Sequence, residues 1–98
     1  MLIKLFRPST NPQVEALQVS ALNRALLYDI IKHGAKGAST LDLHAEHHGN
    51  ISVNVKKLIE RGALIHTILQ DAIDKRGIVH HRIAHRIFIG FDSSVTGV

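Results

Sequence analysis

The most regular hydrophobic pattern in the chain lies between residues 21 and 33. Apolar side chains recur there at helical spacing in Leu22, Leu26, Leu27, Ile30 and Ile31. Gly34 and Gly37 follow directly, and glycine commonly ends a helix. The pattern predicts a helix over residues 21–33, with Ser20 as a candidate cap.

A second helical region, over residues 39–62, reads as two short helices joined by a turn. Ser39 and Asp42 have the spacing of a capping box, so the first helix is expected to begin there. The run His48-Gly49-Asn50 should break it, because Gly and Asn tolerate the left-handed backbone of a sharp turn.

The second short helix is expected to run from Val53 to about Arg61. Ser52 is placed to cap its beginning, and Gly62 supplies the stop. On this helix one stripe is apolar and predicted to face the core, namely Val55, Leu58, Ile59 and Gly62.

After Gly62 the hydrophobic period changes from that of a helix to that of a strand. Residues 64–73 are rich in apolar and β-branched side chains, although a short helix over residues 66–74 is an alternative. Asp74-Lys75-Arg76-Gly77 is a hairpin turn signal. A second strand follows, in which a two-residue alternation predicts one buried face from Val79, Ile83, Ile87, Ile89 and Phe91.

The two ends of the chain are set apart from this region. Residues 1–19 are interpreted as an N-terminal arm and loop, with an additional helix allowed from Pro12 and capped by Asn11. Residues 20–91 form the main domain, and residues 92–98 are expected to be a flexible tail.

Composition narrows the class of protein. The 98 residues suffice for one domain and include no cysteine, which excludes disulfides, thiolate zinc sites and a cysteine nucleophile. No apolar run approaches the roughly 20 residues that span a bilayer, so we expect a cytoplasmic protein that does not enter a membrane. Residues 52–86 hold a net charge of +4 against +1 for residues 1–51, which favours a polyanionic partner; extra lysines for solubility are the alternative.

The order of helix, helix-turn-helix and basic-tipped hairpin resembles the winged helix-turn-helix domain of prokaryotic and phage transcriptional regulators. The stretch from Ile51 to Ile65 is similar to the recognition helix and first wing strand of that family. The resemblance covers roughly residues 20–90. It implies an α+β fold with a three-helix core, a C-terminal β-hairpin wing and a short N-terminal arm.

The resemblance implies that residues 52–61 enter the major groove of double-stranded DNA and that the wing, residues 74–77, follows the backbone. Asn can pair with adenine, and Lys can contact guanine or phosphate. The candidate DNA-binding residues are Ser52, Asn54, Lys56, Lys57, Arg61, Lys75, Arg76 and Arg82. Arg86 is expected to share the strand face of Arg82 and could continue its contact with DNA. An ordinary amphipathic helix with a solvated charged face is the alternative interpretation.

Eight histidines include two clusters, His44/His47/His48 and His80/His81/His85. Neither cluster has the four ligands of a closed zinc site, so surface histidines that gain charge below about pH 6.5 are the preferred interpretation. No nucleophile elbow or phosphate-binding glycine loop is present. We therefore expect neither an enzyme nor a cofactor or metal.

The prediction is a sequence-specific DNA-binding regulator, acting as a homodimer because one helix in one groove gives little specificity. The segment from Met1 to Phe6, together with the helix from Pro12, is the expected dimer surface. The alternatives are a winged-helix module for protein assembly without DNA binding and, with less support, a histidine-based metal sensor.

Overall fold

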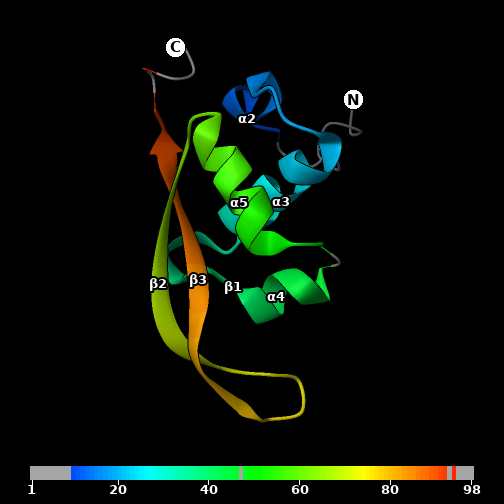
Figure 1. The fold of residues 1–98 in the computed structure, drawn as a ribbon, viewed down its shortest axis with the longest axis vertical. Coiled ribbons are helices and arrows are strands. Elements are labelled where there is room, and N and C mark those ends of the chain that lie inside the picture. Colours follow the sequence, from blue (N-terminus) through cyan, green and yellow to red (C-terminus); the bar gives the residue numbers. More distant parts are fainter. Residues whose placement is uncertain (1–9, 47, 93, 95–98) are drawn as a thin grey trace, which may run out of the picture.

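The computed structural model describes residues 10–46, 48–92 and 94. Within them the chain is an α+β fold with four α-helices and a three-stranded antiparallel sheet (Figure 1). The helices are α2 (Pro12–Ala16), α3 (Ala21–Lys32), α4 (Thr40–Ala45) and α5 (Ile51–Glu60), with a 3₁₀ turn at Gly34–Lys36. The strands are β1 (Ala38–Ser39), β2 (Ala63–Ile73) and β3 (Val79–Phe91).

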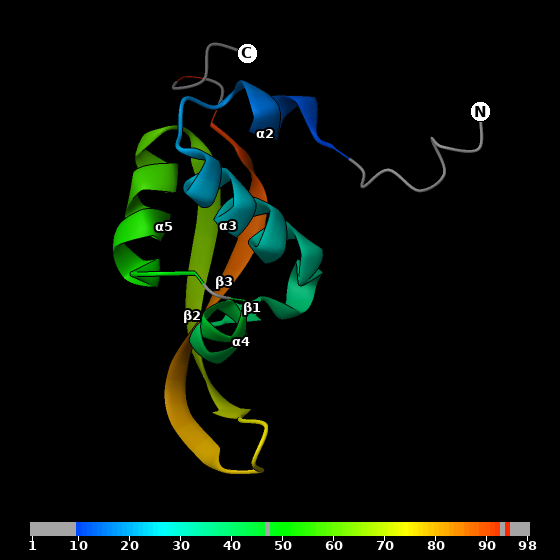
Figure 2. The same cartoon turned by 90° about the vertical axis from the view of Figure 1, so that its right-hand side faces the viewer.

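The sheet has the order β1-β3-β2, so the long hairpin formed by β2 and β3 is joined on its β3 side by the two-residue strand β1. The helices cover one face of the proximal half of this hairpin, the half that holds the start of β2 and the end of β3 (Figure 2). The distal half, which ends in the turn at residues 74–77, projects past α4 (Figure 1). A strand as short as β1 has no periodicity of its own, and sequence analysis did not predict it.

The core lies between the helices and the proximal hairpin. Its largest fully buried side chains are Leu26, Leu27, Ile30, Leu43, Leu58 and Val14. On the sheet side Phe88 and Phe91 pack against this cluster and meet edge to face, with ring centroids 5.2 Å apart. The predicted helix over residues 21–33 is confirmed, with Ser20 as its cap. Of the apolar residues at helical spacing, Leu26, Leu27 and Ile30 are buried, whereas Leu22, in the first turn, is 80% exposed.

The two short helices form as predicted, with one change at the start of α5. The capping box of α4 is present, since the Ser39 hydroxyl accepts from the Asp42 N–H at 3.0 Å and the Asp42 carboxylate accepts from the Ser39 N–H at 3.1 Å. Asn50, and not Ser52, caps α5, and its side chain accepts from the Val53 N–H at 3.2 Å. Ser52 therefore lies in the first turn of the helix.

The hairpin turn at residues 74–77 is confirmed, and the alternative helix over residues 66–74 does not form. The predicted buried face of the second strand was wrong in part. Leu64 pairs with Gly90 and Ile65 with Phe88, so Ile89 is an extra residue in a β-bulge and is 65% exposed. A bulge reverses the facing of every residue beyond it, which places Phe88 and Phe91 on the same, core-facing side.

The helix that sequence analysis allowed from Pro12 is α2, with the Asn11 side chain accepting from the N–H groups of Gln13 and Val14. Val14 is fully buried and Leu17 is 5% exposed, so these two side chains belong to the core, while the exposed side of α2 remains part of the expected dimer surface. The rest of the expected dimer surface, residues 1–6, and most of the expected tail lie outside the described residues.

Candidate nucleic-acid interface

The solvent-facing side of α5 carries the candidate recognition residues. Val55 and Leu58 are buried on the opposite side, at 4% and 0% exposure. Ser52, Lys56 and Lys57 are exposed, and Asn54 is partly exposed. This separation of faces follows from the helical spacing of the apolar positions. Ile59 was predicted to face the core, but it is 43% exposed.

The lysines of α5 form no ion pairs with acidic side chains among the described residues. Among the described residues neither Lys56 nor Lys57 takes part in an ion pair, although Glu60 is on the same helix. Arg61 is the C-cap of α5 and is also exposed. Both lysine side chains are therefore available to an anionic partner.

The tip of the β2–β3 hairpin, residues 74–77, is held in shape by Asp74. Its Oδ1 accepts from the N–H groups of Arg76 (2.8 Å) and Ile78 (3.0 Å), and its Oδ2 contacts His80 Nε2 at 2.9 Å. The bond with His80, followed by the bond with the Ile78 N–H, lowers the pKa of the Asp74 carboxyl below its ordinary value. Lys75 and Arg76 are exposed at this tip, and Arg76 Nη2 lies 3.7 Å from Asp74 Oδ2.

Arg82 stands at a second bulge of the hairpin. Gln70 pairs with Ile83 and Ala72 with His80, so His81 and Arg82 together face Asp71. Arg82 has φ +55° and its N–H donates to Asp71 Oδ1 at 3.2 Å. This bond, with that from His81, lowers the pKa of the Asp71 carboxyl. The side chain of Arg82 stays exposed.

Arg86 does not share the exposed face of Arg82, as the sequence had suggested. It is 7% exposed, on the side of the sheet that faces α5. Its Nε donates to Thr67 Oγ1 at 3.2 Å and its Nη2 to Ser52 Oγ at 3.4 Å. The Ile89 bulge explains the error, because it places Phe88, and with it Arg86 two residues earlier, on the same side of the sheet as Phe91. Burial lowers the pKa of the Arg86 guanidinium.

The histidines are distributed differently from the prediction. His85 is 8% exposed, and the His48 side chain is 10% exposed with its Nε2 at 2.5 Å from Asp29 Oδ2. These two were wrongly placed on the surface. His80 and His81 pair with the carboxylates of Asp74 and Asp71. In residues 10–46 and 48–92 no group of three or more His, Asp or Glu side chains could hold a metal ion.

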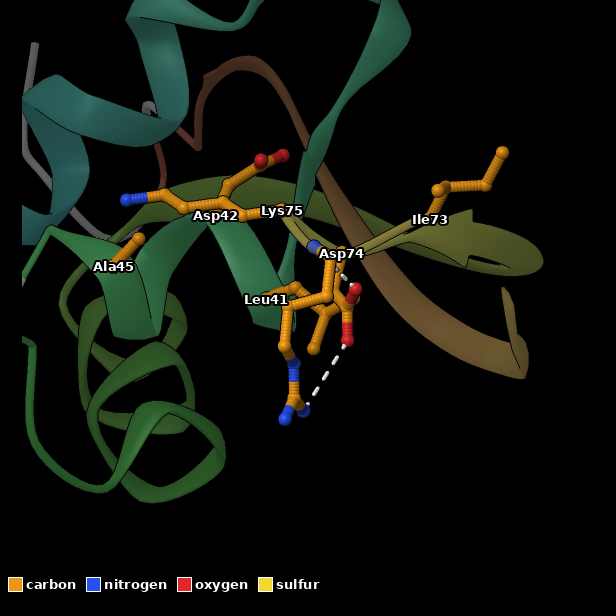
Figure 3. A pocket seen from close by; sticks show the side chains of 7 residues that line it. Leu41, Asp42, Ala45, Ile73, Asp74 and Lys75 are labelled. Carbon is orange, nitrogen blue, oxygen red and sulfur yellow. Dashed lines mark hydrogen bonds and ion pairs between the residues drawn. The ribbon is translucent and has the colours of Figure 1, made fainter. Parts of the chain in front are cut away.

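A hollow of about 340 Å³ lies between α4 and the tip of the hairpin (Figure 3). Leu41, Asp42 and Ala45 line it from α4, and residues 73–76 line it from the hairpin. Its lining combines one aliphatic wall with charged groups of both signs. This mixture does not define one ligand.

The candidate residues fall into separate groups along the molecule. Arg61 lies at the end of α5 next to the start of β2, whereas Lys75 and Arg76 lie at the opposite end of the hairpin, beyond α4 (Figure 1). Ser52 and Asn54, in the first turn of α5, lie between them. The distal hairpin also exposes aliphatic side chains: Leu69 (53%), Ile73 (69%), Ile78 (49%) and Val79 (46%). Val79 was predicted on the buried face of its strand, and this was wrong, because the helices do not cover this end of the hairpin.

Comparisons with protein families, with curated proteins and with solved structures found no match to this chain. The function of the chain is therefore inferred below from its own geometry. Over the described ranges, no helix has both the length and the apolar character needed to cross a bilayer.

Proposed function

We propose that the chain is a winged helix-turn-helix protein that binds double-stranded DNA with α5 in the major groove. The observation that carries this proposal is the exposed face of α5, where Asn54, Lys56 and Lys57 lie on a helix fixed to the core by Val55 and Leu58. A rigid helix with an amide and cations on its free side suits base edges and phosphates.

The topology supports the same proposal. Helix α3, strand β1, helices α4 and α5, and the hairpin follow one another in the order expected of a winged helix, and the sheet order β1-β3-β2 suits that fold. In this assignment α4 and α5 form the helix-turn-helix and residues 74–77 form the tip of the wing. Lys75 and Arg76 then supply contacts to the DNA backbone.

The proposed regulator acts as a homodimer, so that two α5 helices read two half-sites. Sedimentation velocity at high micromolar concentration tests this part. A sedimenting species of twice the chain mass is expected, and a monomer at that concentration would contradict it.

A protein-assembly module is the second candidate, and the hairpin supplies its specific support. Ile73 and Ile78 lie on either side of Lys75 and Arg76 and are 69% and 49% exposed. Aliphatic side chains next to the basic tip interrupt the positive surface and suit a protein partner better than a phosphate backbone. The two candidates differ in whether DNA is bound at all.

The test is binding to a random-sequence DNA duplex from about 50 to 200 mM KCl, followed by fluorescence anisotropy. Three double variants are compared with the wild type: Lys56→Ala/Lys57→Ala on α5, Lys75→Ala/Arg76→Ala on the wing, and Lys32→Ala/Lys36→Ala as a control. The control removes the same charge from the end of α3 and the 3₁₀ turn.

Each lost phosphate contact lowers the slope of log affinity against log salt by about 0.9. Both test variants should therefore show a shallower slope, by up to about 1.8, and the control should keep the slope of the wild type. Absence of binding at the lowest salt would refute the DNA proposal and leave the assembly module. Equal slopes in all four proteins would remove α5 and the wing from the interface.

A further inference from the structure

Arg86 is a buried cation without a carboxylate partner. It is 7% exposed, and within the described part of the chain it takes part in no ion pair. Its only partners there are two hydroxyl groups, Thr67 Oγ1 at 3.2 Å and Ser52 Oγ at 3.4 Å. Its Nη1 is buried and makes no hydrogen bond.

An arrangement of this kind is energetically unfavourable in the free protein. Burying an ion is costly unless an opposite charge compensates it, and an unsatisfied N–H adds to that cost. Hydroxyl groups satisfy hydrogen bonds but provide no negative charge. The guanidinium is thus a preformed positive site that an anion would stabilise.

The position of the guanidinium indicates where that anion binds. The bond from Nη2 to Ser52 Oγ directs Arg86 at the first turn of α5, a ten-residue helix. The N-terminus of a helix carries a partial positive charge and free N–H groups. Among the described residues the Ser52 N–H has no hydrogen-bond acceptor, because the Asn50 cap accepts from Val53 and Asn54 instead.

Lys56 adds a further cation. It is one turn after Ser52 and therefore on the same side of α5, and both residues are exposed. Ser52 thus lies at the surface, with the buried guanidinium behind it and an unpaired lysine beside it. Ser52 and Lys56 belong to α5, whereas Arg86 lies on β3, 34 residues after Ser52, and reaches the helix through its bond to the Ser52 hydroxyl.

We propose that the start of α5 is a phosphate-binding site in which Arg86, the Ser52 hydroxyl and N–H, and Lys56 hold one phosphate group. The ligand class is a phosphate, either a backbone phosphate of DNA or free inorganic phosphate. Assigning it to DNA rests on the proposed function, whereas the site itself does not. In the DNA case this phosphate fixes the depth and orientation of α5 in the groove.

The site is tested first without DNA, by thermal unfolding of the full chain in increasing sodium phosphate at constant ionic strength. The variant is Arg86→Met, which replaces the buried cation by an apolar side chain of similar length. Arg24→Met is the matched control, because its guanidinium also has a buried, unbonded Nε but donates to the Leu17 carbonyl instead of to α5.

The thermal unfolding midpoint of the wild type should rise by about 7 °C when phosphate reaches about ten times its Kd. Arg24→Met should show the same rise from its own starting point, and Arg86→Met should show none. Ser52→Ala removes the hydroxyl while leaving the core intact, and should weaken the response several-fold. An equal rise in wild type and Arg86→Met, or no rise in the wild type, would overturn the proposal.

A second arm identifies the source of the phosphate through the salt dependence of binding to random-sequence duplex DNA. A slope shallower by about 0.9 in Arg86→Met assigns the site to the DNA backbone. An unchanged slope, with the response to inorganic phosphate lost, assigns it to a free anion. If the wild type does not bind DNA but responds to phosphate through Arg86, the proposed function fails and the phosphate site stands.

Discussion

His48 Nε2 lies 2.5 Å from Asp29 Oδ2, and this contact joins the turn before α5 to the last turn of α3. The His48 side chain is only 10% exposed, so the pair is largely shielded from solvent. It restrains the segment that leads into α5, and with it the first turn where Asn50 and Ser52 lie. The orientation of the proposed recognition helix depends on this contact in addition to the core.

A double-mutant cycle measures the contribution of this pair. His48→Ala and Asp29→Ala should each lower the free energy of unfolding in urea by about 1 kcal/mol, since each removes this partly shielded bond; Asp29→Ala also removes the exposed pair with Lys32, which contributes little. The double variant should lose less than the sum, with a coupling of about 1 kcal/mol. Additive losses would show that the two side chains act independently.

Two leucines of α3 test the buried face that the structure assigns. Leu26→Ala should lower the free energy of unfolding by about 2–5 kcal/mol, because Leu26 is 1% exposed and truncation leaves a cavity. Leu22→Ala, the matched control on the same helix, should change it by less than about 0.5 kcal/mol at 80% exposure. A large loss of unfolding free energy in Leu22→Ala would show that Leu22 is buried, as its helical spacing with Leu26 suggests.

Gly37 is required for the close approach of the chain to β3. It has φ +83°, and an added Cβ would lie 2.9 Å from Ile87 Cγ1. Gly37→Ala should therefore destabilise the protein by at least about 2 kcal/mol in chemical denaturation. Gly34→Ala separates the two causes, because Gly34 has φ +61° but open space around it, and should cost about 1 kcal/mol. Equal losses would show that backbone conformation alone matters.

Acid should loosen the wing tip through Asp74. Its pKa is lowered in the folded chain, so the stability it provides is present above the ordinary aspartate value of 3.8 and is lost as the pH falls through the lower folded value. The Asp74 carboxyl should titrate below 3.8 by ¹³C NMR. The difference in free energy of unfolding between wild type and Asp74→Ala should shrink as the pH falls from 3.8 through the lower folded pKa. A titration at or above the ordinary value would contradict the contacts with His80 and Ile78.

Much of the fold could be predicted from the sequence because local signals determine it. The capping box of Ser39 and Asp42 and the turn at residues 74–77 depend on side chains a few positions apart. Ser52 was mistaken for the cap of α5, because Asn50 can fill the same role two residues earlier. Strand β1 was missed because two residues become a strand only by pairing with β3.

The candidate site was harder to predict because its geometry depends on the bulges. Alternation along β3 suggested that Arg86 faces solvent, and the extra residue Ile89 reverses that assignment. A bulge cannot be predicted from local sequence in a strand where polar and apolar residues do not alternate regularly. Lys56 and Lys57 were expected on the exposed side of α5 and are found there, since helical spacing alone determines their position.

The most direct test of the central claim is a ¹⁵N–¹H NMR titration of the chain with duplex DNA, once its amide signals are assigned. DNA binding through α5 and the wing predicts that the largest shift changes cluster at Ser52, Asn54, Lys56 and Lys57, with a second cluster at Lys75 and Arg76. Spectra that do not change with DNA, or changes that avoid α5, would contradict the proposed interface.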